Sequence, residues 1–405
     1  MEHSERDKAP GGVGEVFRAF LLLGFTSFGG PIAHLGYFRT EFVARRQWLT
    51  EKTYADLVAL CQFLPGPASS QVGFALGLMR AGAAGALAAF VAFTLPSALV
   101  LTLFAYGAAV LEGPVGEGLI SGLKIVAVAI VAHAVWGMAR NLCPDRPRAA
   151  IAVLALLVVA MFSGPGGTVG AIMVGALAGA LWCRFHQEET VVDLHLPVSP
   201  AVAWCCLALF ALLLAGLPLL VASGAGQGVA LFDAFYRAGA LVFGGGHVVL
   251  PLLQAEVVQP GWISEDAFLT GYGAAQAIPG PLFTFSAYLG TVMEPMPNGV
   301  IGAAIALVAV FLPGFLLLVG MLPFWNAFRR IDGMQAVMRG ANAAVVGILG
   351  AALYDPVWTS AILGRGEFVL AVAGFVLLSA WKMPPWVVVL VVGLGGLALN
   401  LSGSL

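Results

Sequence analysis

Charged residues are scarce in this chain. Only 10% of its 405 residues are Asp, Glu, Lys or Arg, whereas 60% are hydrophobic. A typical soluble domain carries about 25% charged residues. The shortage excludes an ordinary soluble domain. It predicts an all-α protein that crosses the membrane several times, with the lipid bilayer as a partner.

Motifs for redox, metal and nucleotide chemistry are also missing. The five cysteines show no CxxC spacing. The sequence has no Walker motif and no dinucleotide-binding GxGxxG in a soluble unit. A net charge of −2 gives no basic character, which argues against a nucleic-acid partner. We therefore expect neither a reductase nor an ATP-driven pump, and we expect no enzyme activity, no cofactor and no metal.

Apolar segments of membrane length occupy most of the chain. A polar stretch, 184–200, and one isolated segment, 201–222, separate two groups of such segments. We expect an N-terminal domain at 1–200, a single helix at 201–222 and a C-terminal domain at 223–405. The remaining segments are 16–38, 53–79, 83–111, 117–139, 148–162, 166–183, 231–254, 266–292, 299–325, 334–353, 367–381 and 385–401.

The two halves of the chain are repeats of one another. Five motifs recur in the same order, at an offset that drifts only from 214 to 218 residues. The first members of the pairs are Phe28-Gly29-Gly30, Trp48-Leu49-Thr50-Glu51, Gln62 with Pro65-Gly66-Pro67, Leu95-Pro96, and Gly122-Leu123-Lys124. The second members are Phe243-Gly244-Gly245, Trp262-Ile263-Ser264-Glu265, Gln276 with Pro279-Gly280-Pro281, Leu312-Pro313, and Gly340-Ala341-Asn342.

Positive charge indicates that the second repeat is inverted. The loop after the first segment holds Arg39, Arg45, Arg46 and Lys52, whereas the equivalent stretch 254–266 has no Lys or Arg and three acids. Lys and Arg accumulate on the cytoplasmic side. The two loops therefore face opposite sides, and segment 201–222 is what reverses the second copy. Inverted repeats are typical of secondary transporters.

The same rule favours re-entrant hairpins over simple spans. If 16–38, 53–79 and their repeat mates turn back inside the membrane, nearly all the arginines fall on one side. Each arm of 53–79 then reaches about 18 Å, past the bilayer centre from one side. We expect nine spanning helices and four hairpins, with the N-terminus cytoplasmic and the C-terminus outside. The alternative is thirteen spans with breaks inside them.

The two Pro-Gly-Pro turns are the strongest candidate site. Proline breaks a helix, and broken helices at membrane depth line cavities or are buried in protein. The helix after each turn exposes unpaired N–H groups and a positive dipole end, which bind anions. Two such ends, converging near the midplane, suit a small tetrahedral dianion. The alternative is a kink that serves packing only. The residues concerned are Pro65, Gly66, Pro67, Ser69, Ser70, Pro279, Gly280, Pro281, Thr284 and Ser286.

Glutamines and glycines flank these turns. Gln62 and Gln276 lie three residues before them, where each would contact substrate, stabilise the turn or bond a neighbouring helix. Gly29, Gly30, Gly244 and Gly245 permit tight turns or a close backbone approach.

Four residues are candidates for proton coupling. An unperturbed histidine titrates near neutral pH, which makes His34 and His247 candidates, although inter-helix hydrogen bonds are the commoner role of such histidines. Glu41 and Glu256 match between the repeats. Their loop positions favour a solvated or capping role over a gate.

Lys124 is the charged residue that lies deepest in an apolar segment, and its repeat mate is Asn342. An intramembrane lysine is a functional candidate by default. It would compensate a bound dianion, or else reach to the interface.

These motifs resemble the chromate ion transporter (CHR) family. The resemblance rests on Phe28-Gly29-Gly30-Pro31 and Phe243-Gly244-Gly245-Gly246-His247, together with the paired Gln…Pro-Gly-Pro motifs. It covers roughly 15–400 and matches the long, two-domain form of the family.

The resemblance implies a secondary transporter that exports chromate across the bacterial inner membrane. It also implies chromate resistance and drive from the proton-motive force. The residues alone indicate only a small oxyanion. Sulfate uptake and an anion channel stay open as alternatives, as does a homodimer.

Overall fold

The computed structural model describes residues 11–108, 113–162, 164–184, 198–328 and 331–402. Within these ranges the chain is helical and has no strand. Six helical stretches are long and apolar enough to cross a membrane. They are Ala68–Ala108, Gly113–Leu142, Pro165–Trp182, Pro200–Ala222, Gly299–Phe324 and Gly333–Ala361. The division into nine spans and four hairpins stays a prediction.

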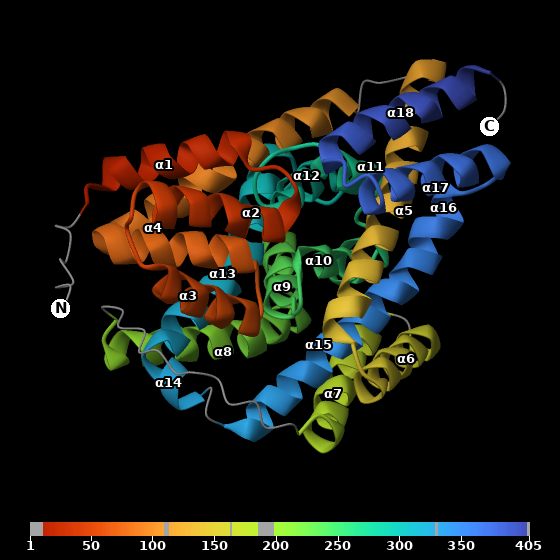
Figure 1. The fold of residues 1–405 in the computed structure, drawn as a ribbon. Helices are drawn as coiled ribbons and strands as arrows, with labels where there is room; N and C mark the ends of the chain where they lie inside the picture. The colour runs from red at the N-terminus through yellow and green to blue at the C-terminus, as the bar shows by residue number, and fades with distance from the viewer. Residues whose placement is uncertain (1–10, 109–112, 163, 185–197, 329–330, 403–405) are drawn as a thin grey trace.

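The first half runs through α1 to α7 (Figure 1). Its elements are α1 (Val13–Thr26), α2 (Gly30–Phe38), the π-helix η1 (Arg39–Arg45), α3 (Glu51–Phe63), α4 (Ala68–Ala108), α5 (Gly113–Leu142), α6 (Arg146–Met161) and α7 (Pro165–Trp182). Helix α4 contains a non-helical kink at Ala81 and Gly82, so it consists of two helices.

The second half repeats this order. It contains α9 (Gln227–Ala240), the short helices η2 (Gly246–Val248) and α10 (Val249–Leu253), the π-helix η3 (Gln254–Val258), α11 (Glu265–Ala275), η4 (Leu282–Thr284) and α12 (Phe285–Val292). Then follow α13 (Gly299–Met321), η5 (Leu322–Phe324), α14 (Trp325–Phe328), α15 (Asp332–Ala352), η6 (Leu353–Trp358), α16 (Thr359–Ala361), α17 (Arg365–Ser379) and α18 (Pro385–Leu401).

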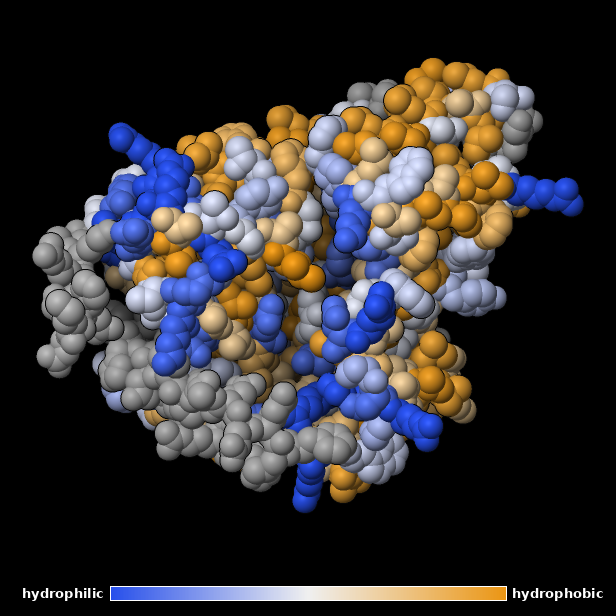
Figure 2. Space-filling view, viewed as in Figure 1, coloured by the Kyte–Doolittle hydropathy of each residue, from blue (hydrophilic) through white to orange (hydrophobic). Residues whose placement is uncertain are grey.

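Helix α8 (Pro200–Ala222) lies between the halves in the sequence and packs on α9 and α13. Only Ala203 and Leu217 are buried among its 23 residues, and the others are exposed or only partly covered. An apolar helix with so much uncovered surface needs lipid as its solvent. Figure 2 likewise shows apolar side chains over the upper right edge, where α17 and α18 lie, and hydrophilic side chains toward the left and middle of that face.

The two halves are interlocked rather than side by side. Helix α5 packs along α17 and α18 of the second half, and α15 packs along α6 and α7 of the first (Figure 1). In contrast, α1 packs on α4 and α9 packs on α13, each within its own half. The interior is therefore built from both halves, and neither encloses it alone.

Glycines allow the exchanged helices to approach closely. A Cβ added to Gly122 of α5 would lie 2.5 Å from the Gly393 carbonyl oxygen of α18. A Cβ added to Gly340 of α15 would lie 2.1 Å from the Gly175 carbonyl oxygen of α7. Small residues at such crossings are the usual means of close packing in membranes. Gly122 and Gly340 are repeat mates, so the same contact is made twice.

Candidate functional site

The helix breaks fall where the prolines and glycines predict them. Helix α3 ends at Phe63 and α4 begins at Ala68, so Pro65-Gly66-Pro67 lies in the gap. In the second half, α11 ends at Ala275 and η4 begins at Leu282, with Pro279-Gly280-Pro281 between them. The glycine pairs likewise separate α1 from α2 and α9 from η2.

Backbone hydrogen bonds between the halves join these four breaks. The Gly66 N–H donates to the Val242 carbonyl at 2.8 Å, and the Gly280 N–H donates to the Ser27 carbonyl at 2.9 Å. Each Pro-Gly-Pro turn thus binds the residue just before the Phe-Gly-Gly sequence of the other half. The Gly-Gly breaks also meet, because a Cβ on Gly246 would lie 3.0 Å from Pro31 Cγ. We call this meeting point the four-break junction.

Only glycine fits the centre of either Pro-Gly-Pro turn. Gly66 has φ 121° and Gly280 has φ 97°, conformations that side chains disfavour. A Cβ on Gly66 would lie 2.9 Å from Gly314 Cα, and one on Gly280 would lie 2.3 Å from Ser97 Oγ. Gly314 follows Pro313 and Ser97 follows Pro96, so each turn rests on the proline-containing helix of the other half.

Gln71 strengthens the junction from its side chain. Its Nε2 donates to the Pro65 carbonyl at 3.0 Å and to the Gly314 carbonyl at 2.9 Å. The side chain therefore ties the first Pro-Gly-Pro turn to a helix of the second half. Gln71 was expected only as one of the residues that open the helix after the turn, and its contact with Gly314 was not predicted, because nothing local in the pattern reveals a partner 243 positions away.

The candidate hydroxyls differ between the two helix starts. The first backbone bond of α4 runs from the Gln71 N–H to the Pro67 carbonyl, so the N–H groups of 68–70 have no acceptor within that helix. Ser69 Oγ lies 3.3 Å from His34 Nδ1. In the second half, Thr284 donates to the Pro281 carbonyl and Ser286 to the Phe283 carbonyl, both at 2.6 Å.

The flanking glutamines have unequal surroundings. Gln62 is exposed, so it does not make the buried contact that its position suggested. Gln276 is half-buried, and its Nε2 is buried without a partner in the described part of the chain. Among the glycines, Gly29, Gly30, Gly244 and Gly245 all have positive φ. A Cβ on Gly244 would lie 3.5 Å from Asn342 Oδ1, which brings Asn342 to the junction.

The two histidines contact different residues. His34 is buried against Ser69 and the ring of Phe93. His247 Nδ1 lies 2.7 Å from the hydroxyl of Tyr272, which is fully buried. Tyr272 was not singled out from the sequence, although it precedes Gln276 by one helical turn and shares its face.

Glu41 and Glu256 are buried, which corrects the solvated role that their loop positions suggested. Both are 8% exposed, and each lies in a π-helix, Glu41 in η1 and Glu256 in η3. Single π turns inside helices are frequent at functional sites. The π-helices prolong α2 and α10 beyond the expected ends of the apolar segments.

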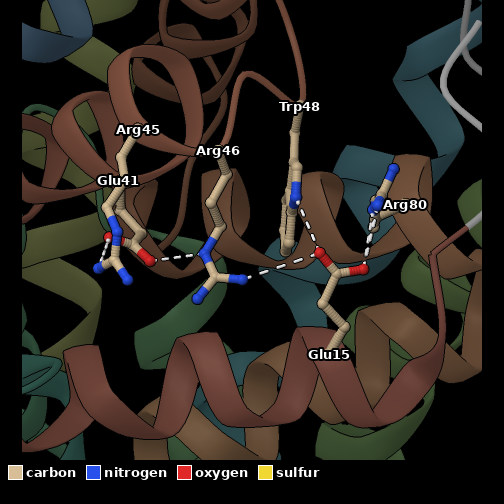
Figure 3. Close-up of polar contacts among 6 residues, drawn as sticks. All are labelled: Glu15, Glu41, Arg45, Arg46, Trp48 and Arg80. Atoms are coloured by element: carbon tan, nitrogen blue, oxygen red, sulfur yellow. Dashed lines mark hydrogen bonds and ion pairs between the residues drawn. The ribbon is translucent and has the colours of Figure 1, made fainter.

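Arginines neutralise both glutamates. Glu41 accepts from Arg45 at 2.9 Å and from Arg46 at 2.5 Å. Arg46 also lies 3.7 Å from Glu15. Glu15 in turn binds Arg80 and accepts from the indole N–H of Trp48 (Figure 3). We call these six residues the first-half ion network.

The second half has a smaller counterpart. Arg237 of α9 binds Glu256 at 2.8 Å and Asp233 at 3.1 Å. Both acids are buried, with side chains 10% and 4% exposed. Arg237 was not expected as a partner of Glu256, because the two residues lie 19 positions apart in the sequence.

Lys124 has a protein counter-ion. Its Nζ lies 2.6 Å from Asp266 Oδ1, at the start of α11. The lysine is therefore already neutralised, and this contact differs from both roles expected for it. Its mate Asn342 has a buried Oδ1 that lacks a partner among the described residues.

The family model described as chromate transporter matches twice, at residues 14–181 and 229–397. The chain belongs to the chromate transporter family. The two matches flank α8, and the family is one of membrane transport proteins rather than enzymes.

Two curated relatives match most of this chromate transporter family member, and a shorter one matches about a third of it. The chromate transport protein of Pseudomonas aeruginosa is 29% identical over 393 residues, 94% of this chain and 91% of the relative. The probable chromate transport protein of Synechococcus elongatus is 27% identical over 380 residues, 90% of this chain and 88% of the relative. The uncharacterized transporter YwrA of Bacillus subtilis is 34% identical over 155 residues, 36% of this chain but 85% of the relative. No solved structure matches this chain.

Proposed function

We propose that this chromate transporter exports chromate across the bacterial inner membrane, drawing on the proton-motive force and conferring chromate resistance. The four-break junction carries the proposal. Broken helices that meet inside a membrane protein are the usual binding sites of secondary transporters. The names of the relatives support chromate as the substrate.

The substrate would lie at the junction, between the two Pro-Gly-Pro turns. The N–H groups that open α4 and the positive ends of the helices after the turns would face the anion. Gly29, Gly30, Gly244 and Gly245 would let the backbone approach it, while Gln276 and Asn342 would contribute polar atoms. The exposed Gln62 and the paired Lys124 would act from the periphery.

Two inverted repeats would provide alternating access. The family model matches each half once, and α5 and α15 are exchanged between the halves. The match to YwrA covers 36% of this chain but 85% of YwrA, which suggests that one half is a unit in its own right. Rocking one repeat or its broken helices against the rest of the protein would then open the junction to either side, with the bonds of Gly66 and Gly280 moving as part of the hinge.

Proton coupling would involve the groups that adjoin the moving parts. Glu41 and Glu256 occupy matching π-helices, and His34 and His247 adjoin the junction. Protonation of either glutamate would weaken its arginine pair and so shift the balance between states. A homodimer is compatible with this scheme but is not needed for it.

Flux of radiolabelled chromate in proteoliposomes tests the proposal. An imposed pH gradient is expected to drive chromate above its equilibrium distribution, and collapse of the gradient with an ionophore should abolish that accumulation. Sulfate added as competitor reveals whether the same site accepts it. A channel would only equilibrate chromate, and net movement in the uptake direction alone would favour sulfate-type import. Absence of chromate flux under every gradient would refute the proposal.

A further inference from the structure

Four hydroxyl groups near the junction are buried without a partner. They belong to Ser27, Ser70, Thr94 and Ser97, which are at most 3% exposed. No hydrogen bond to the described residues reaches any of the four oxygens. Leaving a buried hydroxyl unpaired costs free energy, so a set of four needs an explanation.

Other buried hydroxyls of this protein donate hydrogen bonds within their own helix. Thr270 donates to the Asp266 carbonyl and Thr291 to the Ala287 carbonyl, each at 2.7 Å and one turn back. This back-bonding is the ordinary solution for serine and threonine in an apolar helix. The four hydroxyls do not use it, which leaves them free to donate to something else.

Ser27 and Ser97 adjoin the second Pro-Gly-Pro turn, and Thr94 lies one helical turn before Ser97. The Ser27 carbonyl accepts from the Gly280 N–H. Ser97 Oγ and the Phe93 carbonyl would lie 2.3 Å and 3.3 Å from a Cβ on Gly280. Thr94 follows Phe93 in the same helix. These three residues therefore lie where first-half elements meet a second-half turn.

The remaining member, Ser70, follows Ser69, whose hydroxyl lies beside the ring of His34. That ring lies against Phe93, with centroids 5.3 Å apart, and its Nδ1 lies 3.3 Å from Ser69 Oγ, next to Ser70. The other ring nitrogen, Nε2, is buried and has no partner in the part of the chain that the structure describes. We call His34, Ser27, Ser70, Thr94 and Ser97 the hydroxyl cluster.

The second half has no counterpart of this cluster. The repeat offsets place Val242, Thr284, Phe311 and Gly314 at the positions of Ser27, Ser70, Thr94 and Ser97. Three of these lack a hydroxyl, and that of Thr284 is bonded to the Pro281 carbonyl. The polar set is thus an asymmetric feature in an otherwise duplicated framework.

We infer that the hydroxyl cluster is the subsite that holds a desolvated tetrahedral oxyanion, through neutral donors alone. The inference rests on the proposed function and names the side chains that recognise its substrate. Hydroxyl oxygens also suit a bare cation. However, the N–H groups that open α4 place a positive helix end beside Ser70, which favours an anion. Hydroxyl donors would contact the outer oxygens of the anion and not its central atom, so the subsite would accept chromate and sulfate alike.

Equilibrium binding of radiolabelled sulfate and chromate to the purified full-length protein tests the inference. Ser97→Ala and Thr94→Val are each expected to raise Kd about tenfold for both anions, because each loses one hydrogen bond to a charged ligand. Thr94→Ser keeps the hydroxyl and should stay within about twofold of wild type. Thr291→Val removes a buried hydroxyl that is already bonded to its own helix, so it serves as the matched control.

Several results would overturn the subsite. Unchanged Kd values in Ser97→Ala and Thr94→Val would do so without contradicting the proposed chromate transport. So would equal damage from Thr94→Ser and Thr94→Val, since the hydroxyl would then be irrelevant. Loss of a sodium requirement in the variants, with anion affinity unchanged, would assign the cluster to a cation. If the wild-type protein neither bound nor moved either anion, the proposed function would fail together with the subsite.

Discussion

The two halves share a backbone design but differ in the side chains placed on it. Both have a Pro-Gly-Pro turn that donates from its glycine to the other half, and a π-helix that carries a buried glutamate. Yet the hydroxyl cluster belongs to the first half only. The comparison indicates that duplication preserved the geometry of the breaks, while polar side chains diverged to form one asymmetric site.

The ion pairs also differ between the two halves. In the first half three arginines share two glutamates, whereas in the second one arginine serves two buried acids. The first network therefore has one arginine in excess, whereas the second has one acid in excess. This opposite balance follows the unequal distribution of Arg and Lys along the sequence.

Replacing the glycine of either Pro-Gly-Pro turn should have the largest effect on chromate flux, and the two turns should respond differently. Gly66→Ala puts a Cβ 2.9 Å from the backbone of Gly314, which cannot move aside, whereas the atom nearest to a Cβ at Gly280 is the side-chain oxygen of Ser97, with the Phe93 carbonyl 3.3 Å away. Strain at positive φ adds to both. We expect chromate flux to fall about 100-fold or more in Gly66→Ala and less in Gly280→Ala.

The control for the turn variants is Gly137→Ala, whose Cβ meets no described atom within 4 Å. It should transport normally. The double variant Gly280→Ala/Ser97→Ala removes the clash but also a hydroxyl, so it should recover folding yield more than substrate affinity. Equal flux in Gly66→Ala and wild type would show that the turn does not need its observed backbone conformation.

Removing one arginine from each half should have an intermediate effect. Arg237→Gln leaves Asp233 and Glu256 buried without a cation, which should lower the free energy of unfolding by about 3 kcal/mol. Arg46→Gln leaves Glu41 with Arg45 and Glu15 with Arg80, so a loss of about 1 kcal/mol is expected. Thermal unfolding in detergent measures both.

A second change sharpens the arginine comparison. Arg237→Gln/Asp233→Asn removes one of the two unpaired acids and should restore part of the lost Tm. If Arg46→Gln proved as damaging as Arg237→Gln, the extra arginine of the first half would have no stabilising role.

The smallest effect is expected at Lys124. Asp266 is 69% exposed, so the Lys124–Asp266 pair should contribute little to stability. Lys124→Met and Asp266→Asn are each expected to change chromate flux less than about threefold. A large loss in Lys124→Met with a normal Asp266→Asn would instead show that the lysine acts on the anion.

Local signals in the sequence predicted much of the framework. The helix breaks lie at the prolines and glycines named. The repeat mates Thr50 and Ser264 cap α3 and α11, each accepting from the N–H three residues on. The burial of Glu41 and Glu256 was missed, because a π-helix continues the chain past the apolar segment without a compositional signal. Lys124 was found by its depth, but its partner Asp266 is 142 residues away.

A helical membrane protein with duplicated breaks could be read from the sequence, because composition, proline and glycine act locally and leave a pattern in the chain. The contacts of those breaks became known only from the fold. The bonds from Gly66 to Val242 and from Gly280 to Ser27 join opposite halves, and the exchange of α5 and α15 brings each half into the other. The unpaired hydroxyls also became visible only there, because whether a buried serine has a partner depends on neighbours that the fold supplies.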